Sequence, residues 1–359
     1  WKLHIPTCAT WDASGTTLAG NENGLAGTSV ASLDFPASIF VDNNFTLYVA
    51  DRDNNRIIKF PFNQTNGIVV AGNGTNGSSP NQLSYPKGVA VDQEGAIIVA
   101  DGDNYRIQRF PIGSLNGTTI ASNNSWNILG QMRDLHIDVN NNIYVTDSDY
   151  SQVVKFIPGS GIGIVLAPTG GVGNGANQFS TPFGNFIDEN GNLYVADYNN
   201  HRIQKWLPGA TTGIMVAGTG VAGSTSKQLK RPQAIIVDNN GYVFSFHIKN
   251  TFVLFDHLRY IYIADNVNNR IMQWTTNYTA GGKCLIGCTT VAGTSPTQLS
   301  GPRDLRFDAD GNLYVCDQKN NRVQKYGIIY PPNCTGNATA SKKNLRVYKM
   351  KYLSLSFIL

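Results

Sequence analysis

The chain has 359 residues, 14% of them charged, with enough aromatic and β-branched side chains to fill a large core. Its formal charge of +4 has a local source. The last nineteen residues carry five Lys or Arg and no acid, and without those five charges the remainder carries −1. A remainder that is not basic argues against binding to a nucleic-acid backbone, so no nucleic-acid partner is expected. There is no run of eighteen apolar residues, so no membrane span is expected either.

One pattern recurs six times along the chain. Each copy has a proline-led apolar stretch, a turn anchored by Asp, a second apolar stretch that ends in Asp, and an Asn-Arg-Ile stretch. A period of roughly 40–50 residues with several strands per unit is typical of propeller blades. We therefore predict an all-β fold, a six-bladed β-propeller of four-stranded antiparallel blades within residues 15–330, with repeats at about 33–60, 83–110, 129–156, 179–206, 229–274 and 299–326.

The predicted elements begin with a strand at residues 15–20, ahead of all six copies. Each copy then supplies three strands, which in the second copy are expected at 88–92, 96–100 and 106–110. The sixth copy ends near Tyr326 without an outer strand. We therefore expect residues 15–20 to complete the last blade, which removes two free sheet edges. The other five outer strands are predicted at residues 67–71, 118–121, 162–167, 214–217 and 289–292.

The repeated motifs carry a family resemblance. The patterns Pro-x-Gly-Val-Ala-Val-Asp, Tyr-Val-Ala-Asp and Asn-x-Arg-Ile-Gln-Lys-Phe resemble the NHL repeat family over about residues 15–326. The third copy departs from them, because Met132 replaces the proline and Ser151-Gln152 stand where Asn-Arg is expected. The resemblance implies a six-bladed propeller whose function is set by its surface rather than by its fold.

The fifth copy is interrupted. The inner-turn Asp and the second-strand Asp are nine residues apart in the other copies, but Asp238 and Asp265 are 27 apart, which gives an insertion of 18 residues at about 243–260. Its apolar side chains would suit a partner-binding flap. The alternative, which we favour, is non-coding sequence translated in the gene prediction. We expect the tail, 331–359, to be disordered, and we interpret the segment 1–14 as the start of a mature form or fragment.

Other motifs are explained by the repeat. Five copies place an Asp and an Arg across the turn between the second and third strands, as in Asp51 and Arg56, and such repetition indicates a structural pair. The Gly-rich stretch 72–77 recurs in other copies, and the acidic turn 308–312 matches the other inner turns. Neither therefore predicts a nucleotide or calcium site. We expect no cofactor, no metal and no catalytic residue.

The best candidate site is the column at which the copies differ. The residue after the proline that leads into each inner strand should lie at one mouth of the central channel, with a tyrosine from a nearby turn. We predict that an acidic group of a protein or peptide ligand binds there; the alternative is a set of solvated side chains. The predicted binding residues are Lys87, Arg133, Phe183, Tyr198, Gln233 and Arg303, and Ala37 completes the column.

Cysteines and glycosylation motifs indicate the secretory pathway. Cys284 and Cys288 flank a short bend and are a candidate disulfide, and Cys8 and Cys334 could join the two ends of the chain. Cys316 lies in a strand and is expected to be a buried free thiol. Nine Asn-x-Ser/Thr motifs start at Asn44, Asn63, Asn73, Asn76, Asn116, Asn123, Asn277, Asn333 and Asn337.

The sequence favours a non-catalytic, extracellular, monomeric propeller that serves as a binding scaffold. Two alternatives stay open. One is a metal-dependent enzyme similar to the peptidyl-amidating lyases, in which a His of the variable column binds zinc. Here that column contains no His, since His136 and His201 lie elsewhere. The other is an intracellular propeller that binds RNA or belongs to a ubiquitin ligase, which would require a basic face.

Overall fold

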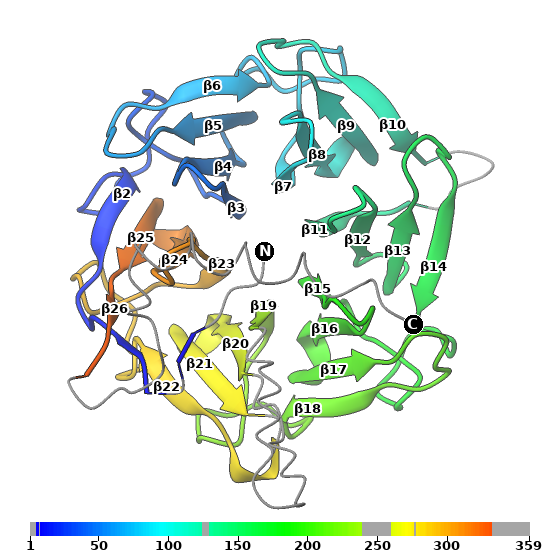
Figure 1. The fold of residues 1–359 in the computed structure, drawn as a ribbon, viewed down its shortest axis with the longest axis vertical. Coiled ribbons are helices and arrows are strands. Elements are labelled where there is room, and N and C mark those ends of the chain that lie inside the picture. Colours follow the sequence, from blue (N-terminus) through cyan, green and yellow to red (C-terminus); the bar gives the residue numbers. More distant parts are fainter. Residues whose placement is uncertain (1–4, 7, 124–128, 239–259, 276–277, 332–359) are drawn as a thin grey trace, which may run out of the picture.

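The structure is a computed structural model that describes residues 5–6, 8–123, 129–238, 260–275 and 278–331. Within these residues six four-stranded antiparallel sheets form a ring (Figure 1), so the predicted six-bladed β-propeller is confirmed. The insertion and the tail that the sequence suggests lie outside the described residues, apart from Tyr260 and Pro331. In the part of the chain that is described, no helix is long and apolar enough to cross a membrane.

The blades follow the chain from the inside outward. Blade 1 contains β3 (Ser38–Val41), β4 (Leu47–Asp51), β5 (Arg56–Phe60) and β6 (Ile68–Ala71). Blade 2 contains β7 (Pro86–Val91), β8 (Ile97–Asp101), β9 (Arg106–Phe110) and β10 (Thr118–Ser122). Blade 3 contains β11 (Met132–Ile137), β12 (Ile143–Asp147), β13 (Gln152–Phe156) and β14 (Gly163–Ala167).

Blades 4 and 5 repeat this order, and blade 6 closes the ring. Blade 4 contains β15 (Asn185–Ile187), β16 (Leu193–Asp197), β17 (Arg202–Trp206) and β18 (Ile214–Gly218). Blade 5 contains β19 (Pro232–Val237), β20 (Tyr260–Asp265), β21 (Arg270–Thr275) and β22 (Lys283–Ile286). Blade 6 contains β23 (Pro302–Phe307), β24 (Leu313–Asp317), β25 (Arg322–Tyr326) and β2 (Thr16–Gly20). Short 3₁₀ turns occur at Gly102–Asn104, Tyr198–Asn200, Asn266–Asn268, Tyr278–Ala280 and Gln318–Asn320.

The N-terminal strand completes the last blade, as predicted. β2 pairs antiparallel with β25, with Thr16 opposite Lys325 and Gly20 opposite Arg322. A second small sheet joins the ends of the propeller, because β1 (Thr10–Trp11) pairs with β26 (Ile328–Ile329). The ring therefore has no open edge between its first and last blades.

One outer strand lies elsewhere than predicted. The outer strand of blade 5 is β22, and not residues 289–292. β22 ends at Ile286, just before Gly287, whose φ of +68° matches the bends at Gly72 and Gly218, where outer strands of other blades end. The disulfide between Cys284 and Cys288 spans this bend. The Val-Ala-Gly of residues 291–293 looks like the end of an outer strand, but it belongs to the loop that follows.

The core lies between neighbouring blades. One cluster joins Ala71 of blade 1 to Val89 and Phe110 of blade 2, and another joins Val153 of blade 3 to Trp206 of blade 4. Middle strands are buried on both faces, which explains why β8 and β16 read as continuous apolar runs. The inner strands of all six blades surround the central channel (Figure 1).

The repeated Asp–Arg pairs are structural, as expected. In blade 1 the Arg56 Nε donates to Asp51 at 2.8 Å, and its two terminal nitrogens donate to carbonyl oxygens in the loop before the blade. Each pair therefore ties the turn of its blade to the preceding loop. In blade 3 a glutamine, Gln152, stands in place of the arginine, and its Nε2 donates to Asp147 at 3.3 Å.

Candidate functional site

The six residues of the variable column converge inside the channel. They lie at or just before the start of each inner strand, and we call them the cationic belt: Ala37, Lys87, Arg133, Phe183, Gln233 and Arg303. All except Lys87 line one small cavity of about 10 Å³. Burial, with a smaller contribution from the nearby charges of Arg133 and Arg303, lowers the pKa of Lys87 to about 8. The strand starts of six separate blades thus form one surface.

A β-bulge aims four of these side chains. In β7 the ladder pairs Pro86 with Asp101 and Gly88 with Ala100, so Lys87 is the extra residue. The same register shift makes extra residues of Arg133, Gln233 and Arg303. A bulge turns its extra side chain out of the ladder. These four residues therefore leave the blade and point into the channel.

Two arginines share one phenyl ring at the centre of the belt. The guanidinium carbons of Arg133 and Arg303 lie 5.0 and 5.3 Å from the centroid of the Phe183 ring. That ring stacks on Tyr198 with centroids 4.2 Å apart. Arg303 also donates to the backbone carbonyls of Ala37 and Arg133, at 2.9 and 3.2 Å. The arginines are thus held by π faces and neutral carbonyls.

The two arginines of the belt lack a direct ion pair. Lys87 pairs with Asp103 at 2.8 Å, but no carboxylate of the described residues lies within ion-pair distance of Arg133 or Arg303. Arg303 is 8% exposed, and burial together with the neighbouring Arg133 lowers its pKa to about 10. Burial also lowers the pKa of Arg133. Burying two guanidiniums together is costly, and the nearest carboxylates act on them only from beyond ion-pair distance, so an anion in direct contact would stabilise them.

The belt closes the channel rather than lining an open mouth. A cavity of about 10 Å³ has room for a single water molecule. Lys87, Phe183, Gln233 and Arg303 are more than nine-tenths buried, and the Gln233 Oε1 has no hydrogen-bond partner among the described residues. Arg133 and Tyr198 are the predicted residues that reach solvent. A ligand would therefore meet the belt through these two side chains.

The same face holds two further arginines that the sequence reasoning missed. The Arg52 guanidinium lies 4.9 Å from the Phe35 ring centroid, and that of Arg231 lies 5.4 Å from the Tyr198 centroid. A signal was available for Arg52, because it follows a second-strand Asp just as Tyr198 does. Ser148 occupies that position in blade 3 and accepts from the Arg133 Nε at 2.8 Å.

A pair of buried acids lies directly below the belt. Asp304 accepts from the Ser38 hydroxyl at 3.0 Å and from Arg306 at 2.6 Å, and Asp134 lies 3.9 Å from the same arginine. Burial and the charge of Asp304 raise the pKa of Asp134 to about 7. The channel is therefore layered, with cations at the belt and carboxylates beneath.

The histidines named by the lyase alternative lie in separate places. His136 is in β11 and packs on Phe186 with ring centroids 5.1 Å apart, and burial lowers its pKa to about 3. The His201 Nδ1 accepts the backbone N–H of Arg231 at 3.2 Å. Across the described ranges, no group of three or more His, Cys, Asp or Glu is arranged to hold a metal ion.

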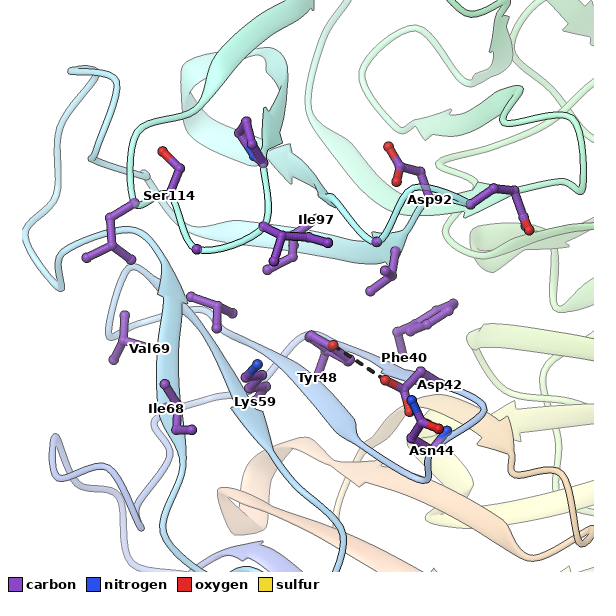
Figure 2. Close-up of a pocket in the computed structure, with 18 of the residues that line it drawn as sticks. Phe40, Asp42, Asn44, Tyr48, Lys59, Ile68, Val69, Asp92, Ile97 and Ser114 are labelled. Carbon is purple, nitrogen blue, oxygen red and sulfur yellow. Dashed lines mark hydrogen bonds between the residues drawn. The ribbon is translucent and has the colours of Figure 1, made fainter.

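A separate depression of about 720 Å³ lies between blades 1 and 2 (Figure 2). Phe40, Ile68 and Ile97 line its apolar part, and the Tyr48 hydroxyl donates to Asp42 at 3.5 Å. Asn44, the first residue of a glycosylation motif, is exposed at its rim. A glycan on Asn44 would cover part of this depression.

The cysteines and sequons agree with the sequence interpretation where they are described. Cys284 and Cys288 form a disulfide, Cys316 is a buried free thiol, and Cys8 is disulfide-bonded. Cys334 lies outside the described residues, as do the motifs at Asn277, Asn333 and Asn337. The six described sequon asparagines are all exposed: Asn44, Asn63, Asn73, Asn76, Asn116 and Asn123.

Comparison with known proteins supports the repeat assignment. Residues 83–110, 187–206 and 299–326 match the NHL repeat, and these segments lie in the second, fourth and sixth copies. No curated protein matches the sequence of this chain.

Several solved structures share the fold at low sequence identity. Auxiliary nutrient binding proteins from Bacteroides ovatus and Bacteroides thetaiotaomicron have TM-scores of 0.63 and 0.64 at 14% and 15% identity. They cover 89% and 88% of this chain, which spans 77% and 76% of theirs. A gluconolactonase from Xanthomonas campestris has a TM-score of 0.58 at 12% identity, covering 92% of this chain and 100% of its own.

Proposed function

We propose that this chain, a six-bladed β-propeller with NHL repeats, is a non-catalytic extracellular binding scaffold that captures an acidic segment of a protein or peptide. The observation that carries the proposal is the pair Arg133 and Arg303, stacked on one phenyl ring without a carboxylate partner among the described residues. A ligand carboxylate would supply the missing counter-charge.

The surroundings of the pair suit such a ligand. Arginine donates to carboxylates through two parallel N–H groups, and these bonds strengthen where water is excluded. Arg231 and Tyr198 stack at the solvent-exposed side of the belt. Arg and Tyr are among the residue types that contribute most of the binding energy in protein interfaces. An Asp or Glu of the ligand would lie over Phe183, with its neighbours on the Tyr198 side.

An extracellular setting is supported by the covalent chemistry. The Cys284–Cys288 disulfide requires an oxidising compartment to persist, and six described sequon asparagines are exposed and accessible to glycosylation. Proteins described as nutrient-binding share this fold, as does a gluconolactonase, so the fold carries binding as well as catalysis. The belt is therefore the basis for choosing the binding role, and the fold is not.

Binding of a fluorescein-labelled hexaglutamate peptide, followed by fluorescence anisotropy, tests the proposal. Arg133→Gln should weaken binding by at least about tenfold, because a charge-assisted hydrogen bond contributes about 1.5–3 kcal/mol. Lys283→Gln is the matched control, since it removes one exposed positive charge from the outer strand β22. Hexalysine should not bind, and binding of hexaglutamate should weaken as salt is raised from low to physiological strength.

Two outcomes would overturn the proposal. One is equal affinity of the wild type and Arg133→Gln for hexaglutamate, with both proteins folded by thermal melting. The other is an equal loss of affinity for hexaglutamate in Lys283→Gln and Arg133→Gln, because that would show that the peptide is attracted by overall charge and not recognised at the belt.

A further inference from the structure

A large funnel opens at the opposite end of the channel from the belt. Its volume is about 660 Å³, within the range of about 300–1,000 Å³ typical of small-molecule sites. It is formed where the inner strands end and the turns to the second strands begin. Blades 1, 3, 4, 5 and 6 contribute, through Phe40, His136, Phe186, Ile236 and Phe307 among others.

The funnel wall is mainly apolar and aromatic. Phe40, Phe186 and Phe307 come from three different blades, and Ile137, Ile187 and Val237 extend the same surface. His136 packs against Phe186 and has a pKa lowered by burial, so it is neutral at physiological pH. Aromatic faces of this kind attract organic cations as well as apolar groups.

The rim of the funnel is acidic. Lys155 and Arg306 are the cationic side chains in its lining, and Asp308 is paired with Lys325 at 3.2 Å. The lining carboxylates are Asp42, Asp138, Asp188, Glu189 and Asp308. The charge of Arg306 is already matched, because it lies 2.6 Å from Asp304 and 3.9 Å from Asp134.

Asp138 is held in the ionised form by its turn. Asp138 accepts backbone N–H bonds from Asn140 and Asn142, and side-chain bonds from Asn142 and Tyr144. Those hydrogen bonds lower its pKa, so the carboxylate keeps its charge. Equivalent turns hold Asp42, Asp188 and Asp308 through backbone N–H groups, so carboxylates from several blades stand around the funnel.

From this geometry we propose that the funnel binds a small organic cation with an apolar body, of the aryl- or alkylammonium class. The apolar body lies among Phe40, Phe186 and Phe307, and the ammonium group lies toward the carboxylate rim. The site is separate from the cationic belt, which lies at the other end of the channel and attracts the opposite charge.

Titration calorimetry with benzyltrimethylammonium tests the proposal, with benzyl alcohol and phenylacetate as neutral and anionic probes. Val139 is 71% exposed at the rim, so its replacement disturbs little packing. Val139→Glu should tighten binding of the cation by about twofold to fivefold, and Val139→Lys should weaken it by a similar factor.

The matched control makes the same charge changes at the other end of the channel. Val267 is 38% exposed in the 3₁₀ turn between β20 and β21, so Val267→Glu and Val267→Lys should leave the affinity unchanged. Phe186→Leu should weaken binding of the cation about threefold while the protein stays folded, because an aromatic face is lost. Arg133→Gln, which tests the belt, should have no effect here.

The proposal fails if benzyltrimethylammonium does not bind at a concentration of about 10 mM, an upper limit for a useful small-molecule site. It also fails if benzyl alcohol or phenylacetate binds as well as the cation, or if the two Val139 variants have equal affinities. Each of these results is independent of whether hexaglutamate binds to the belt.

Discussion

Replacing Arg322 tests how the repeated Asp–Arg pair stabilises the ring. Arg322 is 1% exposed and donates to Asp317 at 2.8 Å. Its other nitrogens donate to four carbonyl oxygens, at distances between 2.7 and 3.3 Å: those of Glu22, Thr294, Ser295 and Gln298. The Glu22 contact ties the N-terminal segment to the last blade, so this arginine also supports the closure of the ring.

The natural third copy suggests the substitution. There Gln152 replaces the arginine and still donates to the aspartate, at 3.3 Å. In Arg322→Gln the four carbonyls lose their donor and Asp317 loses its charge partner. At about 1 kcal/mol for each lost hydrogen bond, and with a buried carboxylate left unpaired, the free energy of unfolding should fall by about 3–5 kcal/mol.

Arg106→Gln is the matched control in blade 2. Arg106 makes the same contacts with Asp101 and three carbonyls, but two of those carbonyl contacts are exposed to water. Water replaces an exposed donor at little cost, so the loss should be about 1–2 kcal/mol. Urea denaturation monitored by tryptophan fluorescence gives both values.

The double variant Asp317→Asn/Arg322→Gln separates the two causes. Removing the buried carboxylate should recover about 1–2 kcal/mol of the loss, because the unpaired charge is gone. The reasoning would be refuted if Arg322→Gln cost no more than Arg106→Gln, or if the two single losses at Asp317 and Arg322 simply added in the double variant.

Three further predictions follow from the fold and the channel. A chain that begins at Asn21 lacks β2 and should melt at least about 10 °C lower than a chain that begins at Ser14, or fail to fold, because both lack β1 but only the shorter one leaves the last blade with an open edge. Asp134 has a folded-state pKa of about 7, above its unfolded value of about 3.9, so the folded form holds an extra proton between these values and stability falls as pH rises through that window. Asp134→Asn should therefore gain stability relative to the wild type from pH 4 to pH 8, by at least about 1 kcal/mol in urea titrations, and a difference independent of pH would contradict this. When the chain is secreted from a eukaryotic host, treatment with a peptide N-glycosidase should lower its mass, and in Asn44→Gln this decrease should be smaller by one glycan. An unglycosylated product would count against the extracellular assignment.

The shape of the candidate site needed the folded chain. Comparison of equivalent positions in the six copies grouped Arg133, Phe183 and Arg303, which lie far apart in sequence but are in contact in the structure. The comparison works because equivalent positions of repeated blades face one axis. The comparison of copies could not predict that these side chains close the channel. It depends on how far each side chain reaches toward the centre and on which partners it meets there, such as the Ala37 carbonyl for Arg303.

The register of the inner strands shows most clearly what the sequence could not predict. Strict alternation along an inner strand would place every second residue in the channel, but the bulges at Lys87, Arg133, Gln233 and Arg303 break that alternation. His136, which follows the bulge at Arg133, lines the funnel together with Phe186 of β15, and the sequence pattern indicated neither residue. In blade 5 the disulfide-bridged bend at Gly287 likewise moved the outer strand to Lys283–Ile286.

The sequence by itself determined the number of blades, the strand order and the closure by residues 15–20, because a blade is a local unit whose turns and apolar runs recur in each copy. Only the tertiary structure decided which side chains meet at the channel axis, which charges lack partners and where a cavity is left. Those properties arise from the convergence of six blades, so no single copy contains them.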